Sequence, residues 1–516
     1  MRRWRWWLAK GLATLVSGRP SLPPLEGRRD TRVIADTAGT RLGRAVEPQL
    51  AAHPGRSGIH ALSMGMEAFA ARVLLARAAE RSLDVQYYIW HGDATGLLLF
   101  EALWQAAERG VRVRLLLDDN NTAGLDETLV VLDAHPGIEL RLYNPVLHRG
   151  WRALNFVTDF ERSNRRMHNK SFTADNLATI VGGRNIGNEY FGVETEVEFA
   201  DLDLLAVGPA VQSVSDAFDR YWNSASAYPV AALLGAAPAG AAERLHSRFE
   251  ATRADPDSVR YGEALRASPF IGNLLGRRLL FEWADARLVV DDPAKTLAPT
   301  PQADALLLPA LLQTIGSPSQ SLDLVSPYLV PGAHGTATLV DLARRGVKLR
   351  ILTNSLSSTD VGVVHAGYAK RRRDLLAAGV RLFEVRRSAV AAVAAAGIKS
   401  SLGTSSSTSL HAKTFALDGR RIFVGSFNFD PRSALLNTEM GLVIDSPLLA
   451  RHLAGAFDDK IPLLAYEVLL APGGQGLQWL ERTPTGETRH TTEPETTLWR
   501  RLGVNLISLL PIEWML

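Results

Sequence analysis

Apolar runs of strand length occur in the same order in both halves of the chain. Each half begins with such a run, continues with a stretch of helical periodicity and then carries two further runs. The runs are 82–90, 109–117 and 137–143 in the first half, and 321–329, 345–352 and 379–385 in the second. This order is typical of βαβ units, whose largely parallel sheet is buried on both faces. We therefore predict an α/β fold in which an internal repeat forms two α/β/α lobes.

The repeat also predicts how the chain is divided. We expect a basic, tryptophan-rich N-terminal segment with a linker (1–30), a first lobe (31–225), a connector (226–301), a second lobe (302–460) and a C-terminal segment that ends in an amphipathic stretch (461–516). The Ser/Thr-rich run 400–409 is expected to be a flexible loop.

A signature of polar residues follows the apolar runs in each half, with the pattern His-x-Lys-x4-Asp-x6-Gly-[Gly/Ser]-x-Asn. A glutamate repeats 28 residues after each histidine. The first copy is His168, Lys170, Asp175, Gly182, Gly183, Asn185 and Glu196, and the second is His411, Lys413, Asp418, Gly425, Ser426, Asn428 and Glu439. Two copies that agree at seven positions are hard to obtain by chance. They indicate one active site at a pseudo-twofold interface between the lobes.

Each signature opens a run that is expected to be a strand, so that alternation places His and Lys on the same face. Tight hairpin turns at Asp175 and Asp418 would then bring Asn185 and Asn428 back to that face. The site would hold two imidazoles, two ammonium groups and two carboxamides. This set suits a phosphodiester, because Lys and Asn donors bind the non-bridging oxygens. No metal or other cofactor is needed, since the cationic side chains supply the charge.

Two histidines allow the reaction to be divided into two steps. One attacks phosphorus and forms a phosphohistidine, while the other protonates the leaving alcohol and later activates water or another alcohol. Glu196 and Glu439 are each expected to fix the tautomer of the histidine in their own repeat.

The aspartates have simpler explanations. Asp175 and Asp418 are part of the catalytic signature, but a turn residue in a hairpin accounts for both, and we favour a structural role. Asp118 and Asp119 end a predicted strand and offer carboxylates to a metal. A polar strand end is the simpler explanation, and no metal is assigned there.

The double signature resembles the phospholipase D superfamily, and the residues around it resemble bacterial cardiolipin synthases. The stretch 425–433, Gly-Ser-Phe-Asn-Phe-Asp-Pro-Arg-Ser, followed by 437–441, Asn-Thr-Glu-Met-Gly, is similar to the second signature of those synthases. The stretches 166–175 and 182–187 are most similar to the cardiolipin synthase C type. The resemblance runs from about residue 57 to the C-terminus. It implies that His168 is the nucleophile and His411 the general acid.

Composition adds little beyond this. The chain has 516 residues, of which 46% are hydrophobic, as in ordinary globular proteins of two domains. A net charge of +3 is too small to indicate a nucleic-acid groove, and the absence of cysteine excludes disulfides and thiolate sites.

Both ends have features of membrane-surface elements. Residues 1–16 are cationic and rich in tryptophan, but the apolar part is short and contains Lys10, so it cannot span a bilayer of about 30 Å. A signal peptide is the alternative, although no clear Ala-x-Ala cleavage site follows. We favour an interfacial anchor. The amphipathic stretch 498–516 either contacts the membrane or packs on the protein, and action on lipids favours the membrane.

The function predicted by the chemistry and the resemblance together is that of a membrane-associated phosphatidyltransferase. It would make cardiolipin by transferring a phosphatidyl group to phosphatidylglycerol, with phosphatidylethanolamine or a second phosphatidylglycerol as donor. Alternatives are a hydrolytic phospholipase D, a nuclease of the same superfamily and a non-enzymatic lipid-binding scaffold. The expected partners are phospholipids and the membrane surface, without nucleic acid. The expected location is the bacterial cytoplasmic membrane, by peripheral or interfacial attachment.

Overall fold

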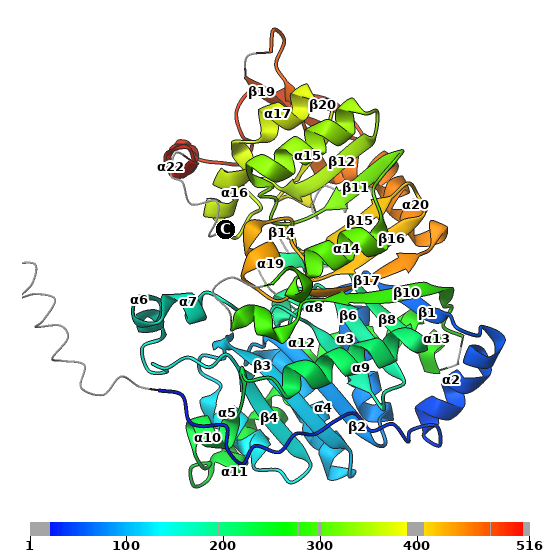
Figure 1. Cartoon of the computed structure of the whole chain (residues 1–516), viewed down its shortest axis with the longest axis vertical. Coiled ribbons are helices and arrows are strands. Elements are labelled where there is room, and N and C mark those ends of the chain that lie inside the picture. The colour runs from blue at the N-terminus through cyan, green and yellow to red at the C-terminus, as the bar shows by residue number, and fades with distance from the viewer. Residues whose placement is uncertain are drawn as a thin grey trace, which may run out of the picture.

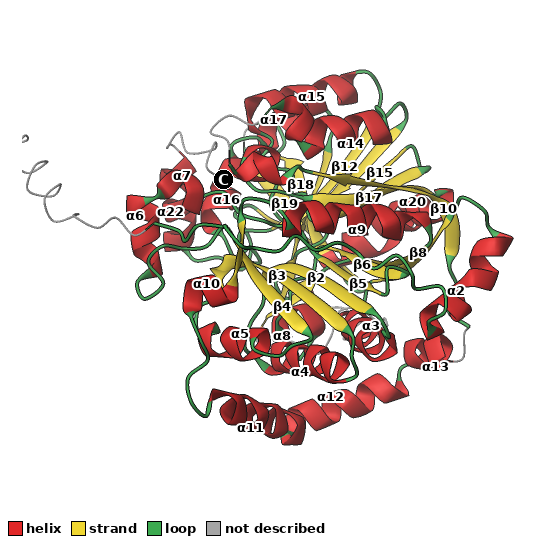
Figure 2. Ribbon diagram, turned by 60° about the horizontal axis from the view of Figure 1, so that its bottom comes forward, coloured by secondary structure: helices red, strands yellow, loops and turns green. Residues whose placement is uncertain are grey.

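Two lobes lie one above the other along the long axis of the molecule, each a sheet with helices packed on its faces (Figures 1 and 2). The computed structural model describes residues 21–193, 197–275, 278–297, 302–389, 407–474 and 476–508. The predicted α/β fold, with two α/β/α lobes from an internal repeat, is confirmed. The N-terminal anchor proposed for residues 1–16 lies outside the described residues.

The first half of the chain supplies the lower lobe of Figure 1. Its elements are α2 (Arg41–Ala52), β1 (Ser57–Leu62), α3 (Gly65–Ala78), β2 (Ser82–Ile89), α4 (Ala94–Glu108), β3 (Arg112–Asn121), α5 (Asp126–Asp133), β4 (Ile138–Tyr143), α6 (Asn155–Thr158), α7 (Phe160–Ser163), β5 (Ser171–Ala174), β6 (Ala178–Gly182), α8 (Asn188–Phe191), β7 (Val197–Ala200), β8 (Asp203–Val207), α9 (Pro209–Trp222), β9 (Ala227–Pro229), α10 (Val230–Leu234), α11 (Ala241–Ala254), α12 (Pro256–Ala267), α13 (Pro269–Leu275) and β10 (Glu282–Val290).

The second half supplies the upper lobe. Its elements are α14 (Leu307–Ile315), β11 (Ser321–Val325), α15 (Gly332–Arg344), β12 (Lys348–Asn354), α16 (Gly362–Ala369), α17 (Arg372–Ala377), β13 (Arg381–Val385), β14 (Ser407–Leu410), β15 (Lys413–Leu417), β16 (Arg421–Gly425), α19 (Pro431–Leu435), β17 (Met440–Asp445), α20 (Pro447–Gly455), α21 (Ile461–Leu464), β18 (Ala465–Leu470), β19 (Leu477–Thr483), β20 (Gly486–His490) and α22 (Leu498–Ser508).

All six predicted strands form, with ends shifted by a few residues, and they pair in parallel as β2–β3–β4 and β11–β12–β13. A repeated ion pair fixes this register in both lobes. Asp84 lies opposite Arg114 and binds it through both carboxylate oxygens, at 2.7 and 2.8 Å. Asp323 and Arg350 do the same in the second lobe, at 2.6 and 2.8 Å. Because two-atom contacts of this kind are geometrically specific, they resist a slip of one strand past the other.

The prediction of a largely parallel sheet was wrong for the rest of each lobe. Hairpins β5–β6 and β15–β16 lie beside β2 and β11. The strands of each hairpin pair antiparallel, because a three-residue turn can join only antiparallel strands. Across the described residues the pairings form one sheet of 18 strands. Its spatial order is β9-β4-β3-β2-β5-β6-β8-β1-β10-β17-β16-β15-β11-β12-β13-β18-β19-β20.

The segment predicted as a connector does more than join the lobes. Strand β10 pairs with β1 of the first lobe and β17 of the second, so it makes the two half-sheets continuous. Helix α11 lies beside α4, and α12 lies beside α11 and α3, on the outer face of the first lobe (Figure 2). A buried apolar cluster with members from both lobes closes the seam beside β10. Its members are Ile59, Leu204, Ala206, Ala210 and Ala284 from the first half, and Ala416, Ile422, Val424, Leu442, Ile444 and Ala450 from the second.

Two other segments differ from the prediction. Residues 407–409, expected to belong to the flexible loop 400–409, instead form β14 together with Leu410, and this strand pairs in parallel with β7 of the other lobe. The C-terminal segment adds β18, β19 and β20 to the second half-sheet. Its amphipathic stretch forms α22, which buries Val504 against Leu356 and Ala366. Among the described residues, no helix has the length and apolar character that a membrane crossing requires.

Candidate active site at the seam between the lobes

The aspartates of the two signatures lie at hairpin turns, away from the histidines. Asp175 and Asp418 have φ angles of 49° and 53°, in the left-handed region that such turns require. The Asp175 carboxylate accepts backbone N–H bonds from Glu80, Arg81 and Ser82, and Asp418 accepts the equivalent three from residues 319–321. Each aspartate follows its histidine by seven residues, a distance of about 23 Å along extended chain. These contacts support a structural role, in which each aspartate ties its hairpin to the start of β2 or β11.

The histidines lie where the two lobes exchange short parallel segments. Met167 pairs with Thr438 in an isolated bridge, and the His168 amide donates to the Thr438 carbonyl at 2.9 Å. In the other copy, β14 pairs with β7, and the His411 amide donates to the Ala200 carbonyl at 2.8 Å. Met167, just before His168, thus lies opposite Thr438, just before Glu439. In the same way Leu410, just before His411, lies opposite Ala200, just before Asp201.

Each imidazole therefore contacts a carboxylate from the opposite repeat. Nδ1 of His168 lies 2.8 Å from Oε2 of Glu439, and Nδ1 of His411 lies 2.5 Å from Oδ2 of Asp201. Glu439 thus contacts the histidine of the other repeat, and not that of its own repeat as the spacing suggested. Glu196, which the spacing predicts as the partner of His411, lies outside the described residues. Asp201 is the acid that contacts His411.

The strand register explains why the spacing pointed to Glu196. Gly182 pairs with Asp203 in β8, and Gly425 pairs with Gly441 in β17. Asp201 and Glu439 both stand two residues before these partners, so they are structural counterparts. Asp201 follows His168 by 33 residues, whereas Glu439 follows His411 by 28. The first repeat is longer in this segment, which includes α8 and β7. An offset of 28 residues from His168 therefore leads to Glu196 and not to Asp201.

The Gly/Ser difference between the two signatures matches the difference between the two acids. Gly183 lies against the Asp201 carboxylate so closely that a Cβ atom there would clash with Oδ1. At the equivalent position of the second copy, Ser426 donates its hydroxyl to Oε2 of Glu439 at 2.5 Å. The shorter acid therefore needs a glycine to reach its histidine, and the longer acid is held by a serine.

The two lysines are almost completely buried beside the histidines. Lys170 Nζ donates to the His168 carbonyl at 2.5 Å, and Lys413 Nζ contacts the carbonyl and Nδ1 of His411. Burial lowers the pKa of Lys170 well below its usual value and lowers that of Lys413 to about 8. Cationic groups so close together in a buried site repel one another, and a bound phosphate would relieve that repulsion.

The histidines and their acids differ in protonation. Burial, and then the charges of Lys170 and Lys413, lower the pKa of His168 well below 6.5, so its imidazole is neutral at pH 7. Burial also raises the pKa of Glu439 to about 7. At the other histidine, burial opposes the ionisation of Asp201, but the positive charges on His411 and Lys413 outweigh it and lower its pKa. Burial and Lys413 lower the pKa of His411, while Asp201 opposes that shift.

The two asparagines are not equivalent. Asn185 is occupied, because Nδ2 donates to the Tyr190 hydroxyl at 3.0 Å and Oδ1 accepts from the Ile89 amide at 3.2 Å. The Tyr190 ring in turn meets the His411 ring edge-on, with centroids 5.2 Å apart. The buried Oδ1 of Asn428 has no hydrogen-bond partner among the described residues. Asn185 thus positions a neighbour of His411, whereas the unpartnered atom of Asn428 is an acceptor and can take a bond only from an N–H or O–H donor.

Acidic residues elsewhere have structural partners. Asp118 binds Arg166 and the Met167 amide, and Asp119 binds Arg149 and the Val146 amide. These bonds position the chain just before His168.

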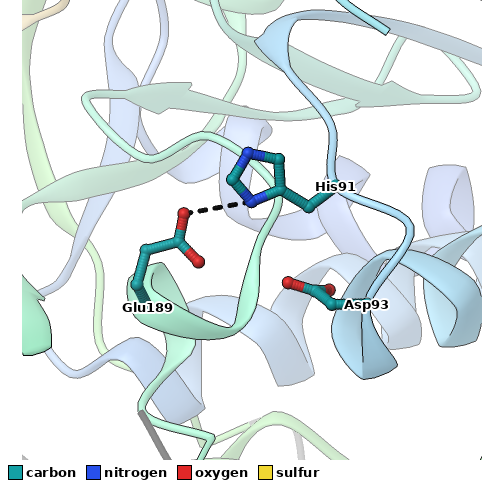
Figure 3. Close-up of side chains that lie close together, drawn as sticks. All are labelled: His91, Asp93 and Glu189. Atoms are coloured by element: carbon teal, nitrogen blue, oxygen red, sulfur yellow. Dashed lines mark ion pairs between the residues drawn. The ribbon is translucent and has the colours of Figure 1, made fainter. Parts of the chain in front are cut away.

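Figure 3 shows a second group, His91, Asp93 and Glu189, whose ligand-type atoms lie within 4.8 Å of one another. His91 pairs with Glu189 at 3.2 Å. Asp93 caps α4 through Gly96 and accepts from the Asn188 amide. The contacts of Asp93 account for its place without a metal ion.

Comparison with known proteins agrees with this arrangement. The family model described as "Cardiolipin synthase, PLD-like domain" matches residues 74–222 and 311–461, one match in each lobe. Cardiolipin synthase C of Escherichia coli is 48% identical over 92% of this chain and 100% of its own length. The chain belongs to the cardiolipin synthase family with phospholipase D-like domains. An uncharacterized protein of Helicobacter pylori is 32% identical over 92% of this chain and 93% of its own.

A solved structure supports the same fold for this family member. Phosphatidylserine synthase of Haemophilus influenzae Rd KW20 aligns with a TM-score of 0.50 at 13% identity, over 83% of this chain and 91% of that one. At this identity the likeness concerns the fold alone. The family membership confirms the resemblance seen in the sequence and makes the protein an enzyme of the phospholipase D superfamily.

The first prediction concerns the acid that sequence reasoning missed. Asp201→Asn keeps the size of the side chain but removes the charge beside His411, so turnover on phospholipid vesicles should fall by about 10²–10⁴-fold. Circular dichroism should show an intact fold. Glu196→Gln is the matched comparison and should keep a rate close to that of the wild type. The reverse ranking of the two variants would assign the role to Glu196.

The second prediction follows from the raised pKa of Glu439. The unfolded carboxyl ionises near pH 4.5, but the folded one ionises only near pH 7, so the wild type loses stability as pH rises through this window. Glu439→Gln avoids this loss and should gain about 2–3 kcal/mol in free energy of unfolding between pH 5 and pH 8, relative to wild type. Urea unfolding at the two pH values measures it. A gain that does not change with pH, or one that exposed Glu250→Gln reproduces, contradicts the prediction.

Proposed function

We propose that this enzyme makes cardiolipin by transferring a phosphatidyl group from a donor phospholipid to a hydroxyl of phosphatidylglycerol. The observation that carries the proposal is the pair of buried histidines, each in contact with a carboxylate of the opposite repeat and flanked by a buried lysine. Membership in the cardiolipin synthase family supports the same reaction. The family implies phospholipid substrates.

In the first step, His168 would act as the nucleophile. Its neutral imidazole donates Nδ1–H to Glu439, which leaves the lone pair of Nε2 free to attack phosphorus. A P–N bond forms as the bond from phosphorus to the donor's leaving oxygen breaks. His411 gives its proton to that oxygen, and the leaving alcohol departs neutral.

In the second step, His411 would act as the base. It takes the proton of an acceptor hydroxyl, whose oxygen attacks phosphorus while the P–N bond breaks and His168 regains its neutral form. One phosphodiester replaces another, so no nucleotide energy source is needed. Lys170, Lys413 and the Nδ2–H group of Asn428 would donate to the non-bridging oxygens as charge develops on them.

The difference between the two acids supports this division of roles. An imidazole that must carry a proton is best placed beside an ionised carboxylate; the pKa of Asp201 is lowered, and Asp201 opposes the lowering of the pKa of His411 by burial and Lys413. An imidazole that must stay neutral is better placed beside an acid that resists ionisation, and His168 has Glu439, whose pKa is raised to about 7. The observed asymmetry is that expected for His168 as nucleophile and His411 as acid and base.

We further propose that the enzyme works at the bacterial cytoplasmic membrane by peripheral or interfacial attachment. The N-terminal segment 1–30, with its tryptophans and arginines, is the proposed anchor. At a bilayer, phosphatidylglycerol hydroxyls are concentrated near the site and compete with water for the phosphohistidine. The hydrolytic phospholipase D reaction is the alternative, because the same residues can activate water.

The third prediction separates transfer from hydrolysis. Purified enzyme should convert labelled phosphatidylglycerol in vesicles into cardiolipin, with and without added phosphatidylethanolamine, and His168→Ala should abolish the product. Released glycerol identifies phosphatidylglycerol as donor, and released ethanolamine identifies phosphatidylethanolamine. Thin-layer chromatography measures cardiolipin, and mass spectrometry measures the released glycerol or ethanolamine. Phosphatidic acid as the sole lipid product in both mixtures would make the enzyme a hydrolase.

A further inference from the structure

Large apolar side chains are exposed on the segment that leads into His168. Between β4 and β5 the chain forms a short 3-10 turn (Arg152–Leu154) followed by α6 and α7. Trp151 is 74% exposed and Val157 81% exposed, and Phe156 and Phe160 are also exposed. Side chains of this size rarely gather in water on one short segment unless they have a binding role.

The base of this segment is firmly held, in contrast to its apolar tip. Asn155 is fully buried and accepts from the amides of Leu147 and His148. Asn144 donates to the carbonyls of Arg162 and Arg165 at 2.8 and 2.6 Å. These bonds attach the exposed tip rigidly to the strand end just before His168.

A second apolar face lies on the other lobe. Helix α22 packs on α16 through Val504, while Leu498, Trp499, Leu502 and Leu506 face away from that contact and are exposed, Trp499 by 80%. The helix contains two arginines and no acidic residue. Arg500 and Arg501 donate to backbone carbonyls, and within the part of the chain that the structure describes neither forms an ion pair with a carboxylate.

The two apolar faces lie on one side of the molecule, on either side of the seam. In Figures 1 and 2, α6, α7 and α22 all project toward the left edge. Figure 1 shows α6 and α7 on the lower lobe and α22 on the upper one, with β14 and α19 between them. β14 leads directly into His411, and α19 follows Asn428 by three residues. The two faces therefore flank the candidate active site.

We propose that the α6–α7 tip and the outer face of α22 together form a docking face that inserts into the interface of an anionic phospholipid bilayer and brings the seam against the lipid headgroups. The inference deepens the proposed function and rests on it for the identity of the substrate. Tryptophan on an otherwise apolar face beside unneutralised arginines is the composition that interfacial binding to anionic lipid requires. Two points of contact, one on each lobe, would also fix how the site faces the membrane.

Because the chain contains no cysteine, single substitutions provide unique labelling sites in the full-length protein. Val157→Cys and Trp499→Cys test the two faces. Leu280→Cys is the matched control, since Leu280 is 84% exposed and stands two residues before β10, which Figure 1 labels on the opposite side of the molecule. Each variant carries an environment-sensitive dye. On vesicles containing phosphatidylglycerol, dyes at 157 and 499 should shift to shorter emission wavelength and be quenched by a nitroxide lipid, while the dye at 280 should not respond.

Two outcomes overturn the docking face. One is a dye at 157 that keeps its aqueous emission while the enzyme sediments with the vesicles. The other is no response at 157 on phosphatidylglycerol or on zwitterionic vesicles, which would assign the exposed face to a protein partner. Insertion at 157 and 499 by an enzyme that forms no cardiolipin would support the docking face and contradict the proposed function.

Activity provides a second readout that separates docking from chemistry. Val157→Asp should lower the ratio of turnover on vesicles to turnover on a short-chain, soluble phosphatidylglycerol by about tenfold, because one buried apolar side chain contributes that much to partitioning. Leu280→Asp should leave this ratio unchanged. An equal fall on both substrates would place Val157 in the fold or the chemistry of the site and would contradict the docking face.

Discussion

The contact on which the site depends is the exchange of carboxylates between the two repeats. His168 needs Glu439 from the second lobe, and His411 needs Asp201 from the first. All four side chains are buried, and a buried charge without its partner costs about 3–5 kcal/mol. Neither lobe therefore holds a complete histidine–carboxylate pair, and the proposed chemistry requires the seam to stay closed. Strand β10 and the apolar cluster beside it provide that closure.

A repeated architecture here supports two different chemical roles. The backbone arrangement is the same in both copies, from the hairpin turns to the short exchanged segments that bring each acid to its histidine. The difference lies in side chains: Gly183 with the shorter Asp201 in one copy, and Ser426 with the longer Glu439 in the other. Burial raises the pKa of Glu439, whereas the charges of His411 and Lys413 lower that of Asp201, and this asymmetry fits the proposed division between nucleophile and acid.

Much of this was accessible from the sequence, because short-range patterns determine it. Apolar runs predicted the central strands, and the duplicated signature predicted two hairpins with His and Lys at their start. Partners far apart in the sequence were not accessible. Equal spacing indicated Glu196, but the register of β8 and β17 brings Asp201 to His411, and no local pattern shows an insertion between repeats. The same limit applies to β10, which pairs with β1 of the first lobe and β17 of the second, and to β14, which pairs with β7 of the other lobe.

The most direct test of the account is to find which histidine carries the covalent intermediate. Enzyme mixed with labelled phosphatidylglycerol should be quenched within one turnover, digested under conditions that preserve phosphohistidine, and mapped by mass spectrometry. The account predicts the phosphatidyl group on the peptide that contains His168, and a longer-lived adduct at that position in His411→Ala supplied with a donor that has a good leaving group. An adduct on His411 in the wild-type enzyme would contradict the assignment and reverse the roles of Glu439 and Asp201.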